Sequence, residues 1–156
     1  GPLAVASPDP GGVKRAQLWR EALEEQLQRQ VGFAMIDKRR SAGLLGGSQL
    51  VAGDVEGATV LFVDDLIATG ETLQRSATAL RRAGALSVSA CAAHGRFVGN
   101  AAEVLAGEAL AKIVVTDSVP PFRLPTGGAV HDKLSVVSAV PVFAEAVRAS
   151  ETAWWT

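Results

Sequence analysis

Residues 60–73 of the chain, VLFVDDLIATGETL, determine how the rest of the sequence is interpreted. The stretch opens with an apolar run that predicts a buried strand, and two carboxylates, Asp64 and Asp65, follow it. From Leu73 onward the apolar residues recur at helical spacing, and Gly84 marks the expected end of that helix. The stretch therefore predicts a strand, a tight loop and a helix N-terminus in direct succession.

The loop between this strand and this helix is suited to binding a phosphate. Gly70 permits a backbone turn that a side chain would obstruct, and the hydroxyls of Thr69 and Thr72 can add hydrogen bonds. The free N–H groups of the loop and of the first helical turn point the same way, and the helix dipole adds positive potential there. Asp64 and Asp65 are suited to sugar hydroxyls or to a hard metal ion such as Mg²⁺. A phosphate site beside a diol site describes a ribose phosphate; the alternative is an ordinary strand–turn–helix with an acidic turn.

The totals of the sequence point to one globular domain. At 156 residues the chain is long enough for a single core, expected over residues 1–150 with a tail at 151–156. It is 48% hydrophobic and 20% charged, and its formal net charge of −1 gives no field that favours nucleic acid or an acidic membrane. The single cysteine, Cys91, excludes an internal disulfide, and its apolar neighbours favour a packing role over a reactive thiol.

The sequence carries no recognisable targeting or membrane segment. No apolar run approaches the ~20 residues that a transmembrane helix needs, and no signal peptide is recognisable. We therefore expect a cytoplasmic enzyme or binding domain that has no nucleic-acid partner and no membrane partner.

Short apolar stretches alternate with helical patterns along the chain. Strands are expected at residues 3–6, 31–36, 60–63, 87–93, 112–116 and 134–137, with a short strand or hairpin arm at 49–52. Helices are expected after the turn at 7–12, after residue 73, from Asn100, and from Ser138 to about residue 149, whereas the proline- and glycine-rich residues 119–132 are expected to form a loop. This alternation predicts an α/β fold, a three-layer sandwich in which helices flank a mainly parallel sheet. In such sheets ligands bind at the carboxyl ends of the strands.

A second candidate cluster, Lys38, Arg39 and Arg40, follows the strand expected at 31–36, and a glycine-rich segment follows it in turn. In an extended stretch Lys38 and Arg40 project to the same face. Two cations on one face suit a polyphosphate whose charge shifts during transfer, and a glycine-rich loop can close over a substrate. The alternative is a solvated basic turn.

The sequence leaves the roles of two further residues open. Asp9, in the turn at 7–12, either caps the helix that follows or binds a metal ion at a strand end. His94, at the end of the strand expected at 87–93, is either a hydrogen-bonded structural residue or an acid, base or ligand.

Several motifs resemble one family in their order and spacing. They are SPDPGGVKRA at 7–16, IDKRR at 36–40, GDVEG at 53–57, VDDLIATGETL at 63–73, AAHGRF at 92–97, TDSVP at 116–120 and KLSVVSAVPVFAEAVR at 133–148. The loop within residues 63–73 resembles the ribose-phosphate-binding motif of type I phosphoribosyltransferases. The chain as a whole resembles the C-terminal half of ribose-phosphate pyrophosphokinases, also called PRPP synthetases, which implies a phosphoribosyltransferase-like fold.

The resemblance implies a reaction and a set of roles. The family transfers the β,γ-diphosphate of ATP to the C1 hydroxyl of ribose 5-phosphate, giving PRPP and AMP for nucleotide biosynthesis, and uses Mg²⁺. By resemblance, Asp64 and Asp65 meet the ribose hydroxyls, and Lys38 and Arg40 stabilise the diphosphate in transfer. Asp9 matches an acid near metal and ribose, and Asp64 is a second candidate metal ligand. The 5-phosphate is held by the loop residues Ala68, Thr69, Gly70, Glu71 and Thr72.

Two positions in this loop depart from the family pattern. The family commonly has Asp where this chain has Ala68, and Gly where it has Glu71. The Glu71 carboxylate weakens phosphate binding unless its side chain turns outward to solvent. The Ala-Thr-Gly sequence also resembles the loops of adenine phosphoribosyltransferases.

The resemblance also implies a partial enzyme. Members of the family have two similar domains, and the N-terminal domain supplies most of the ATP pocket and the contacts between subunits. We therefore expect this chain to bind ribose phosphate, to make little or no PRPP alone, and to form a homo-oligomer or to contact an N-terminal half. Two other hypotheses stay open: a phosphoribosyltransferase that consumes PRPP, and a non-catalytic PRPP-binding regulatory module.

Overall fold

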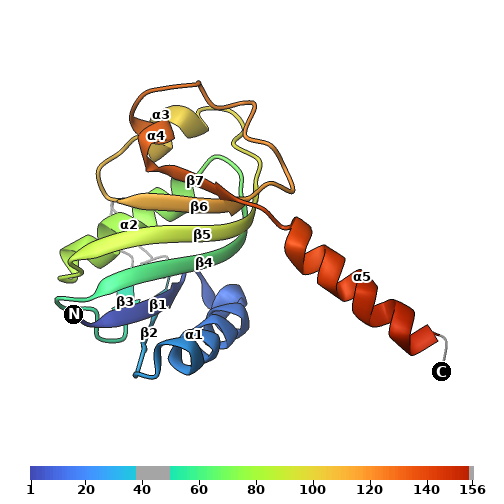
Figure 1. Ribbon diagram of the computed structural model, residues 1–156. Helices are drawn as coiled ribbons and strands as arrows, with labels where there is room; N and C mark the ends of the chain where they lie inside the picture. Colours follow the sequence, from blue (N-terminus) through green and yellow to red (C-terminus); the bar gives the residue numbers. More distant parts are fainter. Residues whose placement is uncertain (38–49, 155–156) are drawn as a thin grey trace.

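The computed structural model describes residues 1–37 and 50–154 of the chain. Within these residues seven strands form one sheet, in the order β3–β2–β1–β4–β5–β6–β7 (Figure 1). Neighbouring strands are parallel except β2 and β3, which run antiparallel. The expected mainly parallel α/β sheet is thus confirmed.

The elements follow the predicted alternation closely. The strands are β1 (Leu3–Ser7), β2 (Gly32–Asp37), β3 (Leu50–Ala52), β4 (Thr59–Ile67), β5 (Ser87–Gly95), β6 (Lys112–Thr116) and β7 (Leu134–Val137). The helices are the 3₁₀ turn η1 (Pro10–Gly12), α1 (Val13–Leu27), α2 (Glu71–Arg82), α3 (Ala101–Leu105), α4 (Ala129–Lys133) and α5 (Val140–Trp154).

The sheet buries apolar side chains on both of its faces. Val60 and Phe62 of β4 belong to the larger apolar cluster, on the side of α2, α3 and α4. Leu61 and Val63 of the same strand belong to the smaller cluster, together with Ala16 of α1. Because successive side chains of a strand point to opposite faces, this alternation places helices on both sides of the sheet, as Figure 1 also shows. The three-layer sandwich is therefore confirmed.

Strand β4 is longer than its apolar run predicts. It continues past residue 63 to Ile67, and its register with β5 pairs Asp64 with Ala92. The acids therefore lie within the last part of the strand and not in the loop after it. The reason is that parallel pairing with β5 satisfies the backbone this far, a long-range contribution that an apolar run does not report.

The segment 119–132, expected to be a loop, contains the start of the one-turn helix α4. Val130 is 3% exposed and anchors this turn in the core. The Lys133 Nζ donates hydrogen bonds to the carbonyl oxygens of Ala106 and Gly107, at 2.9 and 2.6 Å. A single buried apolar residue carries no periodic signal, so only the tertiary contacts define this helix.

Helix α5 ends at Trp154, beyond the expected end near residue 149, and extends away from the sheet (Figure 1). Its start is fixed by Asp117 Oδ1, which accepts a hydrogen bond from the Ala139 amide at 2.9 Å, and this bond lowers the pKa of Asp117. Its large apolar side chains are 58–70% exposed: Val140, Val142, Phe143 and Val147. Exposed apolar groups concentrated on one element are typical of a surface that another polypeptide covers.

None of the helices in the described part of the chain has the length and the apolar character that crossing a lipid bilayer requires.

Candidate functional site

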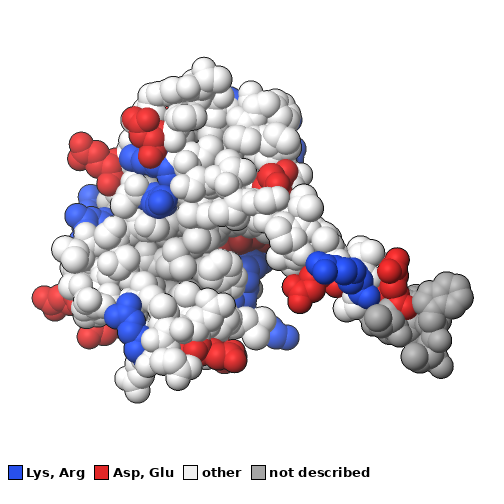
Figure 2. Space-filling view, in the orientation of Figure 1, with Lys and Arg blue, Asp and Glu red and all other residues white. Residues whose placement is uncertain are grey.

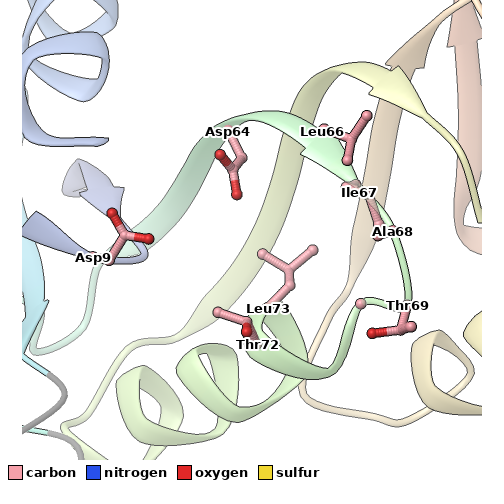
Figure 3. Close-up of a pocket in the computed structure, with 9 residues that line it drawn as sticks. Asp9, Asp64, Leu66, Ile67, Ala68, Thr69, Thr72 and Leu73 are labelled. Carbon is pink, nitrogen blue, oxygen red and sulfur yellow. The ribbon is translucent and has the colours of Figure 1, made fainter. Parts of the chain in front are cut away.

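A pocket of about 230 Å³ lies at the carboxyl end of β4, where the loop leads into α2 (Figure 3). Its lining residues are Asp9, Asp64, Leu66, Ile67, Ala68, Thr69, Gly70, Thr72 and Leu73. Figure 3 shows Asp9 and Asp64 on one side of the pocket and the loop that carries Ala68 and Thr69 on the other. The structure thus brings the turn after β1 and the loop after β4 to one place, as the sheet topology predicts.

Gly70 makes the sharp entry into α2 possible for two reasons. Its φ is +78°, a left-handed conformation that is costly for residues with a Cβ atom. A Cβ atom at this position would also lie 2.5 Å from Leu105 Cδ2. The Gly70 carbonyl then accepts from the Gln74 amide at 2.8 Å and starts the hydrogen bonding of α2. A residue other than glycine would therefore shift both the loop and α3.

The amides of the loop are left available by the fold. The Ile67 carbonyl accepts hydrogen bonds from loop residues 96 and 97, and the Ala68 carbonyl accepts from Val98 at 3.0 Å. Within the described residues, the amides of Thr69, Gly70 and Thr72 have no hydrogen-bond acceptor. The carbonyl groups of this loop thus already accept hydrogen bonds, whereas these amides are left to donate to a ligand. Free amides next to a helix N-terminus are the anion-binding arrangement that the sequence predicts.

Glu71 lies outside the pocket lining. Its side chain is exposed, and the closest described contact of its backbone is a long one, from its amide to Thr69 Oγ1 at 3.5 Å. The carboxylate is therefore free to stay in solvent. Because it lies in the first turn of α2, the positive end of the helix dipole stabilises its negative charge. Ala68 lines the pocket without adding charge.

The two acids of β4 share one cation. Arg15, in the first turn of α1, donates from Nη1 to Asp64 Oδ1 at 3.0 Å and from Nη2 to Asp65 Oδ2 at 3.1 Å. Asp64 Oδ1 also accepts from the Asp65 amide at 2.9 Å. Asp64 lines the pocket with 32% of its side chain exposed, whereas Asp65 is 67% exposed and lies outside the lining. The two acids are thus not equivalent, although the sequence places them side by side.

The pKa values of the two acids move in opposite directions. Burial raises the pKa of Asp64, because the charged form loses hydration at the pocket wall. The hydrogen bond from the Asp64 side chain lowers the pKa of Asp65, which stays the more readily ionised of the two.

Asp9 both caps a helical turn and reaches the pocket. Its Oδ1 accepts from the Gly12 amide at 3.0 Å, and its carbonyl accepts from Ser7 Oγ at 2.5 Å. Asp9 therefore caps the turn η1, whereas the longer helix α1 begins after Gly12 without a side-chain cap. The same carboxylate lines the pocket on the side of Asp64, away from the loop that carries Ala68 and Thr69 (Figure 3).

The acids fit a magnesium ion only together with a substrate. Within the described ranges, no group of three or more Asp, Glu, His or Cys side chains is close enough to form a metal site. Mg²⁺ is often held by one or two carboxylates, with the remaining positions filled by water and substrate phosphates. Asp9, which lines the pocket and contacts no cation among the described residues, fits that pattern, whereas Asp64 already contacts Arg15.

The remaining candidates lie elsewhere. Lys38 and Arg40, expected to hold a diphosphate, are outside the described residues. His94 does not line the pocket, and its Nδ1 lies 2.7 Å from Ser118 Oγ, at the carboxyl end of the neighbouring strand. Cys91 is half-buried, and burial raises the pKa of its thiol, in keeping with a packing role.

Sequence reasoning missed Arg15. The helical spacing of apolar residues identified the buried face of α1, and Arg15 lies on the polar side of the helix. One local signal was available, because the first turn of α1 contains two cations, Lys14 and Arg15, and no acid. Cations are unfavourable beside the positive end of a helix dipole, so an arginine placed there points to a carboxylate partner from elsewhere in the chain.

Comparison with known proteins agrees with this geometry. Residues 46–152 match the sequence model of the phosphoribosyl synthetase-associated domain. The chain belongs to this family. The ribose-phosphate pyrophosphokinase of Clostridium acetobutylicum is 38% identical over 146 residues, which are 94% of this chain and 43% of that protein. The same-named protein of Caldanaerobacter subterraneus is 40% identical over 145 residues, 93% of this chain and 43% of that protein.

Solved structures of known proteins share the fold. The phosphoribosylpyrophosphate synthetase of Mycobacterium smegmatis superposes with a TM-score of 0.75 and 32% identity, over 96% of this chain and 45% of that one. The orotate phosphoribosyltransferase of Aeropyrum pernix, at 22% identity, superposes with a TM-score of 0.52 over 94% of this chain and 65% of that one, and so shares the fold alone. The chain spans less than half the length of the pyrophosphokinases that it matches.

Proposed function

We propose that this chain is the ribose 5-phosphate-binding half of a cytoplasmic ribose-phosphate diphosphokinase of nucleotide biosynthesis. The whole reaction transfers a diphosphate from ATP to C1 of ribose 5-phosphate and releases PRPP and AMP. The observation that carries the proposal is one pocket with two unlike ends: unused amides in the loop after β4, and the Asp64 carboxylate facing them. Membership of the synthetase-associated family supports the same assignment.

The loop end suits the 5-phosphate. Thr69, Gly70 and Thr72 present amides without acceptors in the described structure, and the two threonines add hydroxyl donors. A dianionic phosphate gains from several such donors at once and from the dipole of the twelve-residue helix α2. The lining residues carry no acid next to these amides, because Glu71 stays outside the pocket.

The acid end suits the sugar hydroxyls. Asp64 lines the pocket as a hydrogen-bond acceptor, and a neighbouring pair of hydroxyls on ribose offers two donors. Holding the sugar at both ends would fix the position of its C1 hydroxyl, the group that attacks the β-phosphorus of ATP in the proposed reaction. Such positioning is the main contribution that a protein makes to phosphoryl transfer.

The diphosphate would be held by other groups. We assign Lys38 and Arg40 to it from the resemblance of IDKRR to the family motif. Asp9 would hold Mg²⁺ together with phosphate oxygens, because Asp64 already contacts Arg15. When bound, Mg²⁺ would offset the negative charge that the transferred group carries.

The ATP-binding part would come from a companion half of the enzyme, in the same or another polypeptide. Two observations support this. The chain covers only 43% of the pyrophosphokinases that it matches, and the exposed apolar side chains of α5 give a surface for such a half or for a second copy. This chain alone should therefore bind ribose 5-phosphate and form little PRPP.

Calorimetry with ribose 5-phosphate, PRPP, ATP and adenine tests the proposal. Ribose 5-phosphate and PRPP should bind, whereas ATP and adenine alone should not. Binding of adenine in the presence of PRPP would instead indicate a phosphoribosyltransferase, and no binding of either sugar phosphate would contradict the site. Release of AMP at a normal turnover from this chain alone would contradict its partial nature.

Lys38→Ala separates binding from transfer. We expect this variant to bind ribose 5-phosphate with unchanged affinity and to abolish AMP release once a companion half is supplied. An unchanged rate of AMP release would remove Lys38 from the proposed mechanism.

A further inference from the structure

Arg15 bridges the two acids of β4. Each carboxylate receives a different nitrogen of its guanidinium: Nη1 contacts Asp64 at 3.0 Å and Nη2 contacts Asp65 at 3.1 Å. Arg15 therefore cross-links two consecutive residues of β4 from another element, α1. Figure 2 shows blue and red side chains together in the hollow between the body and α5.

This position of Arg15 is not favourable for α1 itself. Arg15 is the third residue of the helix, where the positive end of the helix dipole disfavours a cation. The turn before it is tight, since a Cβ atom on Gly12 would lie 2.7 Å from Ser7 Oγ and 3.8 Å from Arg15 Nη1. The neighbouring Lys14, also in the first turn, is exposed and has no described contact with the acids. The local penalty at Arg15 is thus offset by two carboxylates that the tertiary fold supplies.

The cross-link also solves an electrostatic problem in the acid pair. Adjacent carboxylates repel each other, and such pairs commonly resolve this by binding a proton or a metal ion. The guanidinium supplies one positive charge in a fixed planar fork and always keeps it. It uses two of its five N–H groups on the acids and leaves the pocket face of Asp64 to other donors.

We propose that Arg15 is the resident cation of the Asp64–Asp65 pair, so that the pair excludes a divalent ion and accepts sugar hydroxyls without one. The first part of this proposal, that Arg15 keeps a divalent ion off the pair, concerns the acids alone. The second part, that the pair accepts sugar hydroxyls without a metal ion, rests on the proposed function. Magnesium is then left to Asp9 and the phosphates of the substrate. Arg15 is a positioning residue in this scheme, because it acts through the acids.

Metal binding without any sugar tests the first part. Mn²⁺, a paramagnetic probe for Mg²⁺, is titrated into the wild-type chain, Arg15→Met, the matched control Lys14→Met and the double variant Arg15→Met/Asp64→Asn, with electron paramagnetic resonance as the readout. Arg15→Met should bind Mn²⁺ about tenfold more tightly than the wild type, since an uncompensated pair of carboxylates gains a cation site. Lys14→Met should match the wild type, and the double variant should lose the gain. Equal affinity of Arg15→Met and the wild type would overturn the proposal.

Sugar binding in the presence and absence of metal tests the second part. The affinity of the wild type for ribose 5-phosphate should be the same with Mg²⁺ as with a chelator. Arg15→Met should bind about tenfold more weakly in chelator and recover with Mg²⁺. Arg15→Lys keeps the charge but not the planar fork of the guanidinium. Its affinity for ribose 5-phosphate in chelator should lie between those of the wild type and Arg15→Met. A wild type that loses affinity in chelator, or an Arg15→Met chain that binds like it there, would overturn this part.

The two measurements keep the proposals apart. If the wild type binds no ribose 5-phosphate in either buffer, the proposed function is wrong, and the Mn²⁺ measurement alone decides whether Arg15 is the cation of the pair. Thermal unfolding checks that each variant is folded. If Arg15→Met does not fold, the same two measurements are made on Arg15→Lys.

Discussion

The two ends of the pocket are built in different ways. The loop end is made of backbone: its amides come from within residues 69–72, and Gly70 and the start of α2 fix their direction. The acid end is made of side chains from β4 and α1, which lie 49 and 50 residues apart in sequence at the two Arg15 contacts. The loop end is open to a ligand as it stands, whereas the acid end is already engaged with an internal partner.

This difference has consequences for recognition. Backbone amides carry no ionisable group, so the loop end should respond little to pH and to metal ions. The acid end must redistribute its hydrogen bonds when a sugar enters, and its affinity for the sugar should respond to pH. A phosphate is therefore expected to supply most of the binding free energy, and the acids are expected to select the sugar attached to it.

The largest expected effect comes from breaking the loop end. Gly70→Ala should lower the free energy of unfolding by about 2–5 kcal/mol, because the left-handed backbone and the contact with Leu105 both oppose a Cβ atom. Gly57→Ala is the matched control, since Gly57 has a φ of +66° but open space around it, and should cost only about 1–2 kcal/mol. Chemical denaturation measures both. Equal losses would mean that the packing of the loop against α3 is not what makes Gly70 necessary.

The next effect distinguishes the two acids. Asp64→Asn should weaken the binding of ribose 5-phosphate by about tenfold to a hundredfold, because it removes a charged acceptor from the pocket wall. Asp65→Asn should weaken it by only about threefold, because Asp65 lies outside the lining and acts through Arg15. Calorimetry on both variants gives the comparison. A larger loss for Asp65→Asn would reverse the roles assigned to the pair.

The acid end should also give sugar binding a pH dependence. Because burial raises the pKa of Asp64, this carboxylate takes up a proton at a higher pH than an ordinary aspartate as the pH falls. Protonated Asp64 accepts hydroxyl donors less well than the carboxylate does. The affinity for ribose 5-phosphate should therefore fall several-fold as the solution is acidified from neutral pH and Asp64 takes up its proton.

Asp64→Asn is the control for this pH dependence, because the sugar phosphate itself also titrates. The profile of the variant should report only the protonation of the ligand, and the difference between the two profiles should report Asp64. Identical profiles would show that the ionisation of Asp64 does not affect the sugar.

The smallest effect concerns the departure from the family pattern at Glu71. Removing its charge with Glu71→Gln should raise the affinity for ribose 5-phosphate by about twofold, because an exposed carboxylate outside the pocket repels a phosphate only weakly. Glu103→Gln, in the first turn of α3, is the matched control and should change nothing. A gain of tenfold or more would mean that Glu71 turns toward the phosphate.

The local parts of the site could be predicted from the sequence, and the long-range parts could not. The strand, the tight turn at Gly70 and the N-terminus of α2 are encoded by consecutive residues, so residues 60–73 predicted them. The extension of β4 through the acids depends on pairing with β5, and the contact of Arg15 depends on how α1 packs. Neither leaves a periodic signal in the chain.

The same distinction explains the other differences. The turn α4 depends on the buried Val130 and on contacts of Lys133, so its composition alone indicated a loop. Asp9 was open between a cap and a ligand, because only the fold brings its carboxylate to the pocket wall as well. The roles of Lys38 and Arg40 stay predictions that rest on the motif.

A crystal structure of the chain with ribose 5-phosphate tests the central claim most directly. We expect the phosphate within hydrogen-bond distance of the amides of Thr69, Gly70 and Thr72, with the ribose hydroxyls against Asp64 and Arg15 still in contact with Asp65. A phosphate bound elsewhere while these amides stay unoccupied would contradict the account.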